Sequence, residues 1–291
     1  MDTQSAFTLV NPQNNTLAFK VYAFDDDRYF EATTNYNYYS MLLVAEGSGS
    51  LVADVTQYKF SANSLICFAI YQPFSIKSDG VFKGILINFH PDFFCLHKHR
   101  NEVSCNGVMF NNIYDSPVLK LGGAEMQTLI NIAHEIMAEM RDVKLAQYEL
   151  LISYLKIFLI NASRIKINQL QLEEANARKE PAMVNELKEA IETQFKKLHR
   201  SSDYADLLHA SAKVLNRVSK NYFNKTLSSL IAERIIIEAK RELYLTPKSV
   251  KLIAYELGFS DEFYFSRFFK SKVAVSPQLF RDTVGFDKAD A

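Results

Sequence analysis

The sequence has few cysteines, no long uninterrupted apolar run and no excess of charge of either sign. Its 291 residues include three cysteines, Cys67, Cys95 and Cys105, and this small odd number argues against a disulfide framework and favours a reducing compartment. The most apolar stretch, residues 150–163, is shorter than the roughly 20 residues that span a bilayer and contains Lys156. The N-terminus has no basic segment followed by an apolar one, so we expect no secretory signal, no membrane partner and a cytoplasmic location.

Glycine is scarce after the first part of the chain. Seven of the nine glycines lie at or before Gly123, so turns are concentrated early. Between residues 36 and 89, short runs rich in β-branched and aromatic residues alternate with turn residues, which is typical of a β-barrel or sandwich. In one run we expect Leu51, Ala53 and Val55 to share one face of a half-buried strand.

The apolar period becomes helical from residue 124 onward, first in one helix and then in a longer one over residues 144–171. Apolar residues surround most of the longer helix, which is more than one flank of a small β-domain covers. We therefore predict a subunit interface on it; the alternative is a central helix buried within its own chain. The expected pairing face has 3,4 spacing and consists of Leu145, Tyr148, Ile152, Leu155, Leu159 and Ala162.

The length suits two domains of roughly 150 residues. We expect a first domain over residues 1–171, a polar linker over 172–183 that contains Pro181, and a helical domain over 184–291. The 33 basic and 33 acidic residues of the chain cancel, but residues 196–281 hold 16 basic against 8 acidic residues, a net charge of +8. A basic module joined to a mildly acidic one indicates a DNA-binding domain with a separate regulatory domain.

Two segments of the basic module share one plan, a short helix, a tight turn and a second helix with exposed basic residues. In the first segment Ser211 is predicted to cap the second helix, over residues 212–221. In the second segment Gly258 permits the sharp turn, Phe259 fills the core and Asp261 caps the following helix. Both segments are therefore predicted to be helix-turn-helix motifs.

The outward side chains of the two second helices suit duplex DNA. Arg bonds bidentately to guanine and Asn to adenine, so base edges in a major groove are assigned to Asn216, Arg217 and Arg267. Phosphates are assigned to Lys213, Lys220 and Lys270. The exposed face of the last helix also carries Glu262, Phe263 and Ser266. The alternative for either segment alone is a basic bundle whose cations are only solvated. An apolar helix between the segments, over residues 228–245, would hold the pair so that it addresses successive major grooves, roughly 34 Å apart.

The basic module also contains a connected series of short motifs. They are His-Ala-Ser at 209–211, Arg217, Arg234, Ala239, Leu243, IAYELGFSDEFYFSRFFK from Ile253, and SPQLFR at 276–281. On these motifs, residues 196–284 resemble the DNA-binding domain of the AraC-type transcription regulators. The resemblance implies sequence-specific binding of double-stranded DNA, activation more often than repression, and RNA polymerase as a candidate partner.

This chain departs from the family pattern at three positions. Family members usually have Gly where this chain has Asn224 and Ala274. Asn tolerates a left-handed backbone, whereas Ala274 either strains that turn or changes it. Glu262 either accepts a hydrogen bond from cytosine or repels phosphate, which leaves the bases read by the second motif open.

The strand and turn layout of residues 36–89 resembles the cupin-like β-barrel with which many AraC-type regulators sense their effector. Metal-dependent cupin enzymes place two His and a Glu on these strands, but no His precedes His90 and Phe74 stands where a late His is common. We therefore expect no catalytic residues, no cofactor and no cupin metal. The resemblance implies a small-molecule effector inside the barrel, and the candidate lining residues, which could equally fill the core, are Tyr36, Tyr38, Tyr39, Phe68, Tyr71 and Phe74.

A second candidate metal site is a cluster of His and Cys within sixteen residues, namely His90, Cys95, His97, His99 and Cys105. Its spacing matches no compact zinc motif, so solvated histidines and small buried cysteines are the favoured interpretation, and zinc binding stays the alternative.

Together these patterns predict an α+β protein with a cupin-like β-barrel and dimerisation helices, followed by an all-α domain with two helix-turn-helix motifs. The expected function is an effector-controlled, homodimeric transcription regulator. Two alternatives are a ligand-independent regulator whose N-terminal domain binds a protein, and a cupin-type enzyme, which lacks its metal ligands.

Overall fold

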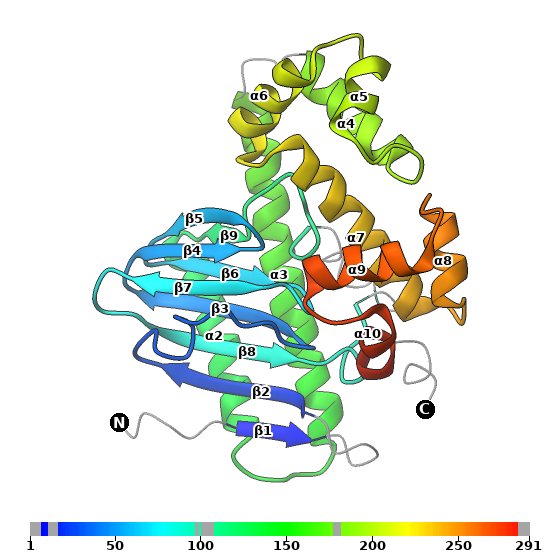
Figure 1. Cartoon of the computed structure of the whole chain (residues 1–291). Helices are drawn as coiled ribbons and strands as arrows, with labels where there is room; N and C mark the ends of the chain where they lie inside the picture. The colour runs from blue at the N-terminus through cyan, green and yellow to red at the C-terminus, as the bar shows by residue number, and fades with distance from the viewer. Residues whose placement is uncertain (1–6, 11–16, 97–98, 100–107, 177–181, 285–291) are drawn as a thin grey trace. The chain divides into compact units, whose positions relative to one another are not determined.

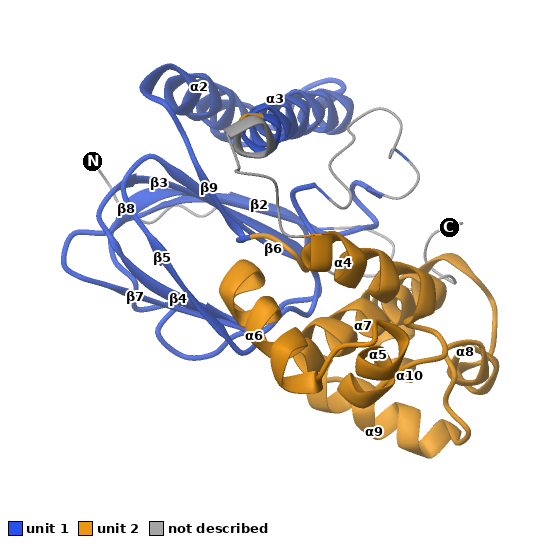
Figure 2. Ribbon diagram, turned by 90° about the horizontal axis from the view of Figure 1, so that it is seen from above, with its two compact units in different colours: residues 1–112, 116–171 blue, residues 113–115, 172–291 orange. Residues whose placement is uncertain are grey.

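The computed structural model describes residues 7–10, 17–96, 99, 108–176 and 182–284, and it has the expected mixed α+β composition (Figure 1). Two compact units are present: unit 1 comprises residues 1–112 and 116–171, and unit 2 comprises residues 113–115 and 172–291 (Figure 2). Among the described residues, none of the helices combines the length and the apolar character needed to cross a lipid bilayer.

Unit 1 contains two antiparallel sheets. The six-stranded sheet has the order β1-β2-β8-β3-β6-β9 and the three-stranded sheet the order β5-β4-β7. Their bounds are β1 Phe7–Val10, β2 Leu17–Phe24, β3 Tyr39–Glu46, β4 Gly49–Ala53, β5 Thr56–Phe60, β6 Ser64–Phe68, β7 Phe74–Ser78, β8 Lys83–Phe89 and β9 Val118–Lys120.

The main core of unit 1 lies between the two sheets. On β3, Leu42 and Val44 face this core together with Leu51 and Ile76 of the smaller sheet. The intervening residues of β3 point to the opposite face because side chains alternate along a strand. That face is also buried, since helices α2 (Gly123–Glu139) and α3 (Gln147–Asn176) lie along it (Figure 2). The apolar runs of the central strands reflect this double coverage.

The sequence expectation for strand β4 is wrong in one detail. Leu51 and Ala53 share one face of β4 as predicted, and both are buried, but the strand ends at Ala53 and Val55 lies exposed in the turn. Asp54 adopts a left-handed backbone at this turn, with φ of 55°, which ends the alternation on which the expectation rested.

The predicted pairing face of α3 is wrong in register. Leu155, Leu159 and Ala162 are fully buried within this chain, next to Leu151 and Phe158, so they belong to the core of unit 1. Two further members of the expected face lie elsewhere: Leu145 precedes α3 and is fully exposed, and Tyr148 packs edge-on against Phe93. Among the side chains of α3 that the structure describes, the exposed large apolar ones are Tyr148, Leu150, Ile157 and Leu172.

Unit 2 is helical in its described part. Its helices are α4 Ala182–Gln194, α5 Ser201–Leu207, α6 Ala212–Phe223, α7 Leu227–Leu245, α8 Val250–Glu256, α9 Glu262–Val273 and α10 Pro277–Val284. The segment expected to be a linker, 172–183, is partly helical, because α3 continues to Asn176 and α4 begins at Ala182; residues 177–181 lie outside the described residues.

Candidate nucleic-acid interface

The two predicted helix-turn-helix motifs are present in unit 2, as α5 with α6 and as α8 with α9. In the first turn His209 has a left-handed backbone, and the N–H of Ala210 donates to the carbonyl of Ala205 at 3.0 Å. In the second turn Gly258 takes the left-handed position, with φ of 82°, and the N–H of Phe259 donates to Ala254 at 2.9 Å. The same bond thus closes both turns.

The second helix of each motif begins at the predicted cap. Ser211 Oγ accepts from the N–H of Val214 at 3.2 Å. Asp261 accepts from the N–H groups of Phe263 and Tyr264 at 3.1 and 2.9 Å. These bonds satisfy amide groups that have no partner within the helix, and each fixes the direction in which its helix leaves the turn.

Helices α6 and α9 correspond residue by residue at an interval of 50. Both have 12 residues, and both are followed by a residue in the left-handed conformation. Arg217 and Arg267 are therefore each the sixth residue of their helix, and Lys220 and Lys270 the ninth. The buried positions also coincide: Leu215 with Phe265, Ser219 with Phe269, and Phe223 with Val273. The two motifs consequently present one Arg and one Lys at the same two helix positions.

Most of the predicted DNA-contacting residues are exposed, namely Lys213, Arg217, Lys220, Phe263, Arg267 and Lys270. Asn216, Glu262 and Ser266 are half-buried. Asn216 has a partner within the fold, because its Oδ1 accepts from the N–H of Leu227 at 3.1 Å, at the start of α7. This bond ties α6 to α7, a role that the sequence pattern does not reveal.

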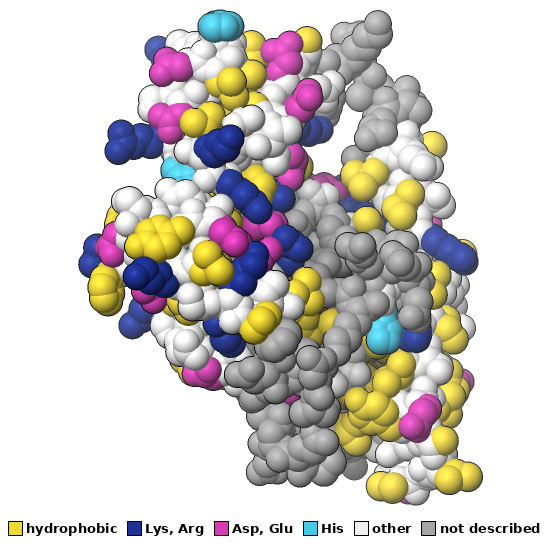
Figure 3. All heavy atoms as spheres, turned by 90° about the vertical axis from the view of Figure 1, so that its right-hand side faces the viewer, with side chains coloured by type: hydrophobic (Ala, Val, Ile, Leu, Met, Phe, Trp, Pro, Cys, Tyr) yellow, Lys and Arg dark blue, Asp and Glu magenta, His cyan; other side chains and the backbone are white. Residues whose placement is uncertain are grey.

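Two exposed aromatic residues of the second motif were not among the expected DNA-contacting residues. Tyr264 on α9 is 56% exposed and Tyr255 on α8 is 50% exposed, the latter with the ammonium group of Lys251 at 6.0 Å from its ring centre. Tyr264 lies in the aromatic run DEFYFSRFF, in which inward and outward rings are adjacent in sequence. Only the helical period distinguishes its exposed ring from the buried rings of Phe265 and Phe269. In the upper left part of Figure 3, Lys and Arg side chains are mixed with hydrophobic and acidic ones.

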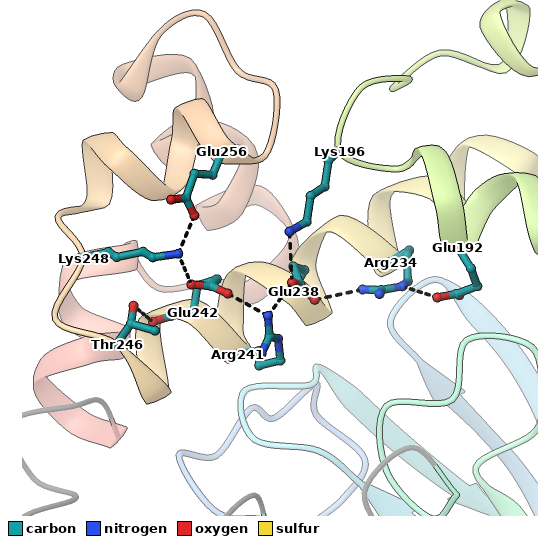
Figure 4. A network of polar contacts seen from close by, with 9 residues as sticks. All are labelled: Glu192, Lys196, Arg234, Glu238, Arg241, Glu242, Thr246, Lys248 and Glu256. Atoms are coloured by element: carbon teal, nitrogen blue, oxygen red, sulfur yellow. Dashed lines mark hydrogen bonds and ion pairs between the residues drawn. The ribbon is translucent and has the colours of Figure 1, made fainter.

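A polar network runs along α7 (Figure 4). The buried carboxylate of Glu238 pairs with Arg241 at 2.7 Å, with Lys196 at 3.4 Å and with Arg234 at 3.4 Å. Arg234 also pairs with Glu192 of α4 at 2.7 Å. Burial raises the pKa of Glu238, but the hydrogen bond to Arg241 and the attraction to Arg241, Arg234 and Lys196 together outweigh this effect, so the pKa lies below its ordinary value.

The network continues toward the second motif. Glu242 pairs with Arg241 at 2.7 Å and with Lys248 at 2.9 Å, and Lys248 reaches Glu256 of α8 at 2.6 Å. Arg281 of α10 donates to the carbonyl of Lys248 at 2.5 Å. Helix α7 is thus bonded directly to α4 and, through Lys248, to α8 and α10.

The candidate effector residues of unit 1 do not all lie together. Tyr36 stacks on Tyr38 with ring centres 4.7 Å apart and meets Phe74 edge-on at 5.9 Å. Phe68 stacks on Phe74 at 3.8 Å within the core between the sheets. Tyr71 is buried, and its N–H donates to the carbonyl of Tyr36.

Tyr39 lies on the other face of the six-stranded sheet, against Phe89 and Phe110 at 5.0 and 4.8 Å. Two half-buried tyrosines that the sequence did not single out, Tyr22 and Tyr58, pack instead against the core between the sheets. Burial raises the pKa of Tyr22 to about 12.

The His and Cys cluster is only partly described. His90 is buried, and its Nδ1 accepts from the N–H of Asp92 at 3.2 Å, while the ring of His99 packs on Phe94. His97 and Cys105 lie outside the described residues. Within the described part of the chain, no group of three or more His, Cys, Asp or Glu residues is placed to hold a metal ion.

Parts of this chain are similar in sequence to two known proteins. The "Msm operon regulatory protein" of Streptococcus mutans is 28% identical over 166 residues, which are 55% of this chain and 55% of the relative. An HTH-type transcriptional regulator of Bacillus subtilis is 31% identical over 134 residues, 46% of this chain and 40% of the relative. This chain thus spans about half the length of the curated relatives it matches.

Among solved structures, ToxT from Vibrio cholerae aligns with 92% of this chain and 98% of its own, with a TM-score of 0.41 and 16% sequence identity. A family model described as "Helix-turn-helix domain" matches residues 204–283, which begin within α5 and include all of α6, α7, α8 and α9. Residues 204–283 therefore form a helix-turn-helix domain, and parts of this chain are similar in sequence to known transcription regulators.

Proposed function

We propose that this protein regulates transcription by binding a specific sequence of double-stranded DNA with both of its helix-turn-helix motifs. The observation that carries the proposal is the matched position of Arg217 and Arg267, exposed on equivalent helices 50 residues apart. A guanidinium group bonds bidentately to guanine O6 and N7, and an exposed helix face of this kind fits a major groove.

The other exposed cations act on the backbone of the duplex. Lys213, Lys220 and Lys270 bind phosphates, which sets the register of the two helices without reading sequence. Ser266 and Glu262 lie at the edge of this face, where each can meet a base. The side-chain oxygen of Asn216 already accepts a hydrogen bond from the backbone of α7. We therefore assign Asn216 mainly a structural role, and contact with adenine is its secondary role.

Unit 1 acts as the cupin-like sensor in this proposal, with the effector bound beside the core between its sheets. Tyr22, Tyr36 and Tyr38 are half-buried and present rings and hydroxyl groups that suit a small, partly apolar effector. Such an effector acts by binding one conformation of the protein more tightly than another, since only differential affinity shifts the equilibrium. Activation through contact with RNA polymerase is the expected outcome.

The protein works as a homodimer through the outward face of α3. This face carries Leu150, Tyr154 and Ile157, which follow a 4,3 spacing and are exposed or half-buried, whereas the inward face is already used by the core of unit 1. A second copy of the same helix would cover these residues.

The experiment that tests the proposal is selection of bound sequences from random duplex DNA by the full chain. We expect a recurring site with two half-sites, and an affinity that falls steeply between low and physiological salt, because a module of net charge +8 releases counterions from several phosphates. Recovery of no preferred sequence, or an affinity that is independent of salt, would contradict the proposal.

A further inference from the structure

The short segment between α4 and α5, residues 195–199, reaches the turn of the second helix-turn-helix motif. His199 Nε2 lies 2.8 Å from the carbonyl oxygen of Leu257, and its ring centre is 4.7 Å from that of Phe259. At Gly258, a side chain would collide with the carbonyl oxygen of Lys196. Glycine is therefore required here for close approach as well as for its positive φ.

Phe259 connects the segment 195–199 to α9. Its ring is nearly buried and packs against Phe265 and Phe268 of α9, with ring centres 5.2 and 5.3 Å apart. A displacement of His199 therefore acts on the aromatic core that holds α9 in place.

The same segment is anchored to the first motif and to α7. The hydroxyl group of Tyr204, a buried residue of α5, donates to the carbonyl of Leu198 at 3.2 Å. The ring of Phe195 is buried under the guanidinium group of Arg234, 3.9 Å away, and Lys196 pairs with Glu238. The segment thus contacts α5, α7 and the turn before α9.

We propose that residues 195–199 hold the two helix-turn-helix motifs in one fixed relative orientation. His199 is the positioning residue, and Gly258 is the point at which the segment and the second motif approach closely. The spacing between the two DNA half-sites is then set by side chains that do not touch DNA. This inference rests on the proposed function, but its structural part is independent of DNA.

The segment is needed because α7 alone does not fix the orientation of one helix-turn-helix motif relative to the other. A 19-residue helix is about 28 Å long, so a small rotation at either end moves the far motif by several ångströms. A second connection, away from the axis of α7, removes this rotation. Two motifs held in this way tolerate only one separation of their half-sites.

The structural test measures the distance between spin labels on α6 and α9 in the full chain without DNA. The labels replace Asn221 and Ser271, exposed residues at equivalent positions of the two helices, in a background in which Cys105 is replaced by Ser. We expect one narrow distance distribution for the parent protein and for the control Lys197→Ala, which changes an exposed residue of the same segment.

His199→Ala should broaden the distribution, and His199→Gln should restore it, because its amide can donate to the carbonyl of Leu257. If the alanine variant fails to fold, His199→Leu keeps an apolar group against Phe259 and loses only the hydrogen bond. A broad distribution in the parent protein, or one that stays narrow in these variants, would overturn the inference.

The second arm uses the duplex selected with the parent protein, with one base pair inserted between its half-sites. We expect the insertion to weaken binding at least about tenfold for the parent protein and less than about threefold for His199→Ala. An equal penalty for both proteins would also overturn the inference. If no sequence is selected at all, the proposed function fails, whereas the label distances still decide whether the motifs are locked.

Discussion

Asn224 and Ala274, which stand 50 residues apart, end helices α6 and α9 in the same left-handed conformation. Their φ angles are 56° and 66°, and their N–H groups donate to the carbonyls of Lys220 and Lys270 at 3.1 and 2.9 Å. Of the two outcomes expected for Ala274, a strained turn or a changed one, the structure shows the strained turn. Asn accepts this conformation more readily than Ala because its short polar side chain bonds locally.

The first prediction follows from this strain. Ala274→Gly should stabilise the protein by about 0.5–1 kcal/mol, because the relief of left-handed strain exceeds the entropy that glycine adds to the unfolded chain. Asn224→Gly is the matched control and should change stability less. Thermal unfolding of the three proteins measures both effects, and a destabilised Ala274→Gly variant would contradict this account of the turn.

The second prediction concerns the buried carboxylate on α7. Glu238→Gln should destabilise the protein by about 2 kcal/mol, since Arg241, Arg234 and Lys196 lose a charged partner in a site that is 8% exposed. Glu256→Gln, at a side chain that is 38% exposed, should cost much less. Urea unfolding measures the free energy of unfolding of both variants. Equal losses of stability would mean that burial of the network does not add to its contribution to stability.

The third prediction is a dependence of stability on pH at His199. Burial lowers the pKa of His199 below its ordinary value of 6.5, against opposing effects of the carbonyl groups of Leu257 and Phe195 and of the Asp203 carboxylate. Because the unfolded chain binds the proton more readily, the stability contributed by neutral His199 is complete above pH about 6.5 and is lost as pH falls below that value.

The melting temperature should therefore fall between pH 7.5 and 5.5, and fall less for His199→Gln. Glu238 does not interfere in this window, since its pKa is lowered from an ordinary value of 4.5. Parallel pH profiles for the two proteins would exclude His199 as the cause.

The fourth prediction separates the two faces of α3. Leu150 and Ile157 are 39% and 46% exposed, whereas Leu155 and Leu159 are fully buried. Replacing the exposed pair with Glu should yield a folded monomer, and replacing the buried pair should unfold unit 1, because two charges would lie in an apolar core. Sedimentation and circular dichroism of the full chain report the outcomes. A parent protein that sediments as a monomer would remove the dimer from the proposal.

Local chemistry made the helix-turn-helix motifs predictable from sequence. Ser211 and Asp261 cap their helices through bonds to residues two or three positions away, and Gly258 takes the positive φ that its turn requires. Such features depend on short spacings, which a sequence displays directly. The alternation of β4 was predictable for the same reason, up to the turn at Asp54.

Features that depend on distant partners were not predictable. The inward face of α3 is decided by the sheet it covers, and both of its faces read as apolar, so Leu155 was placed on the wrong one. Tyr39 and Tyr38 are neighbours in sequence, yet Tyr39 packs on Phe89 at the helix-covered face of the sheet and Tyr38 stacks on Tyr36. The period-two alternation separates them, but only the fold shows which side holds the core between the sheets.

The most direct measurement of the central claim compares the affinity of Arg217→Ala, Arg267→Ala and Lys220→Ala for the selected duplex and for random DNA. Each Arg variant should lose about 1–3 kcal/mol on the selected duplex and much less on random DNA, because its side chain reads bases. Lys220→Ala should lose equally on both and reduce the salt slope by about 1. Equal losses on both duplexes for the two Arg variants would contradict the claim that α6 and α9 read DNA sequence.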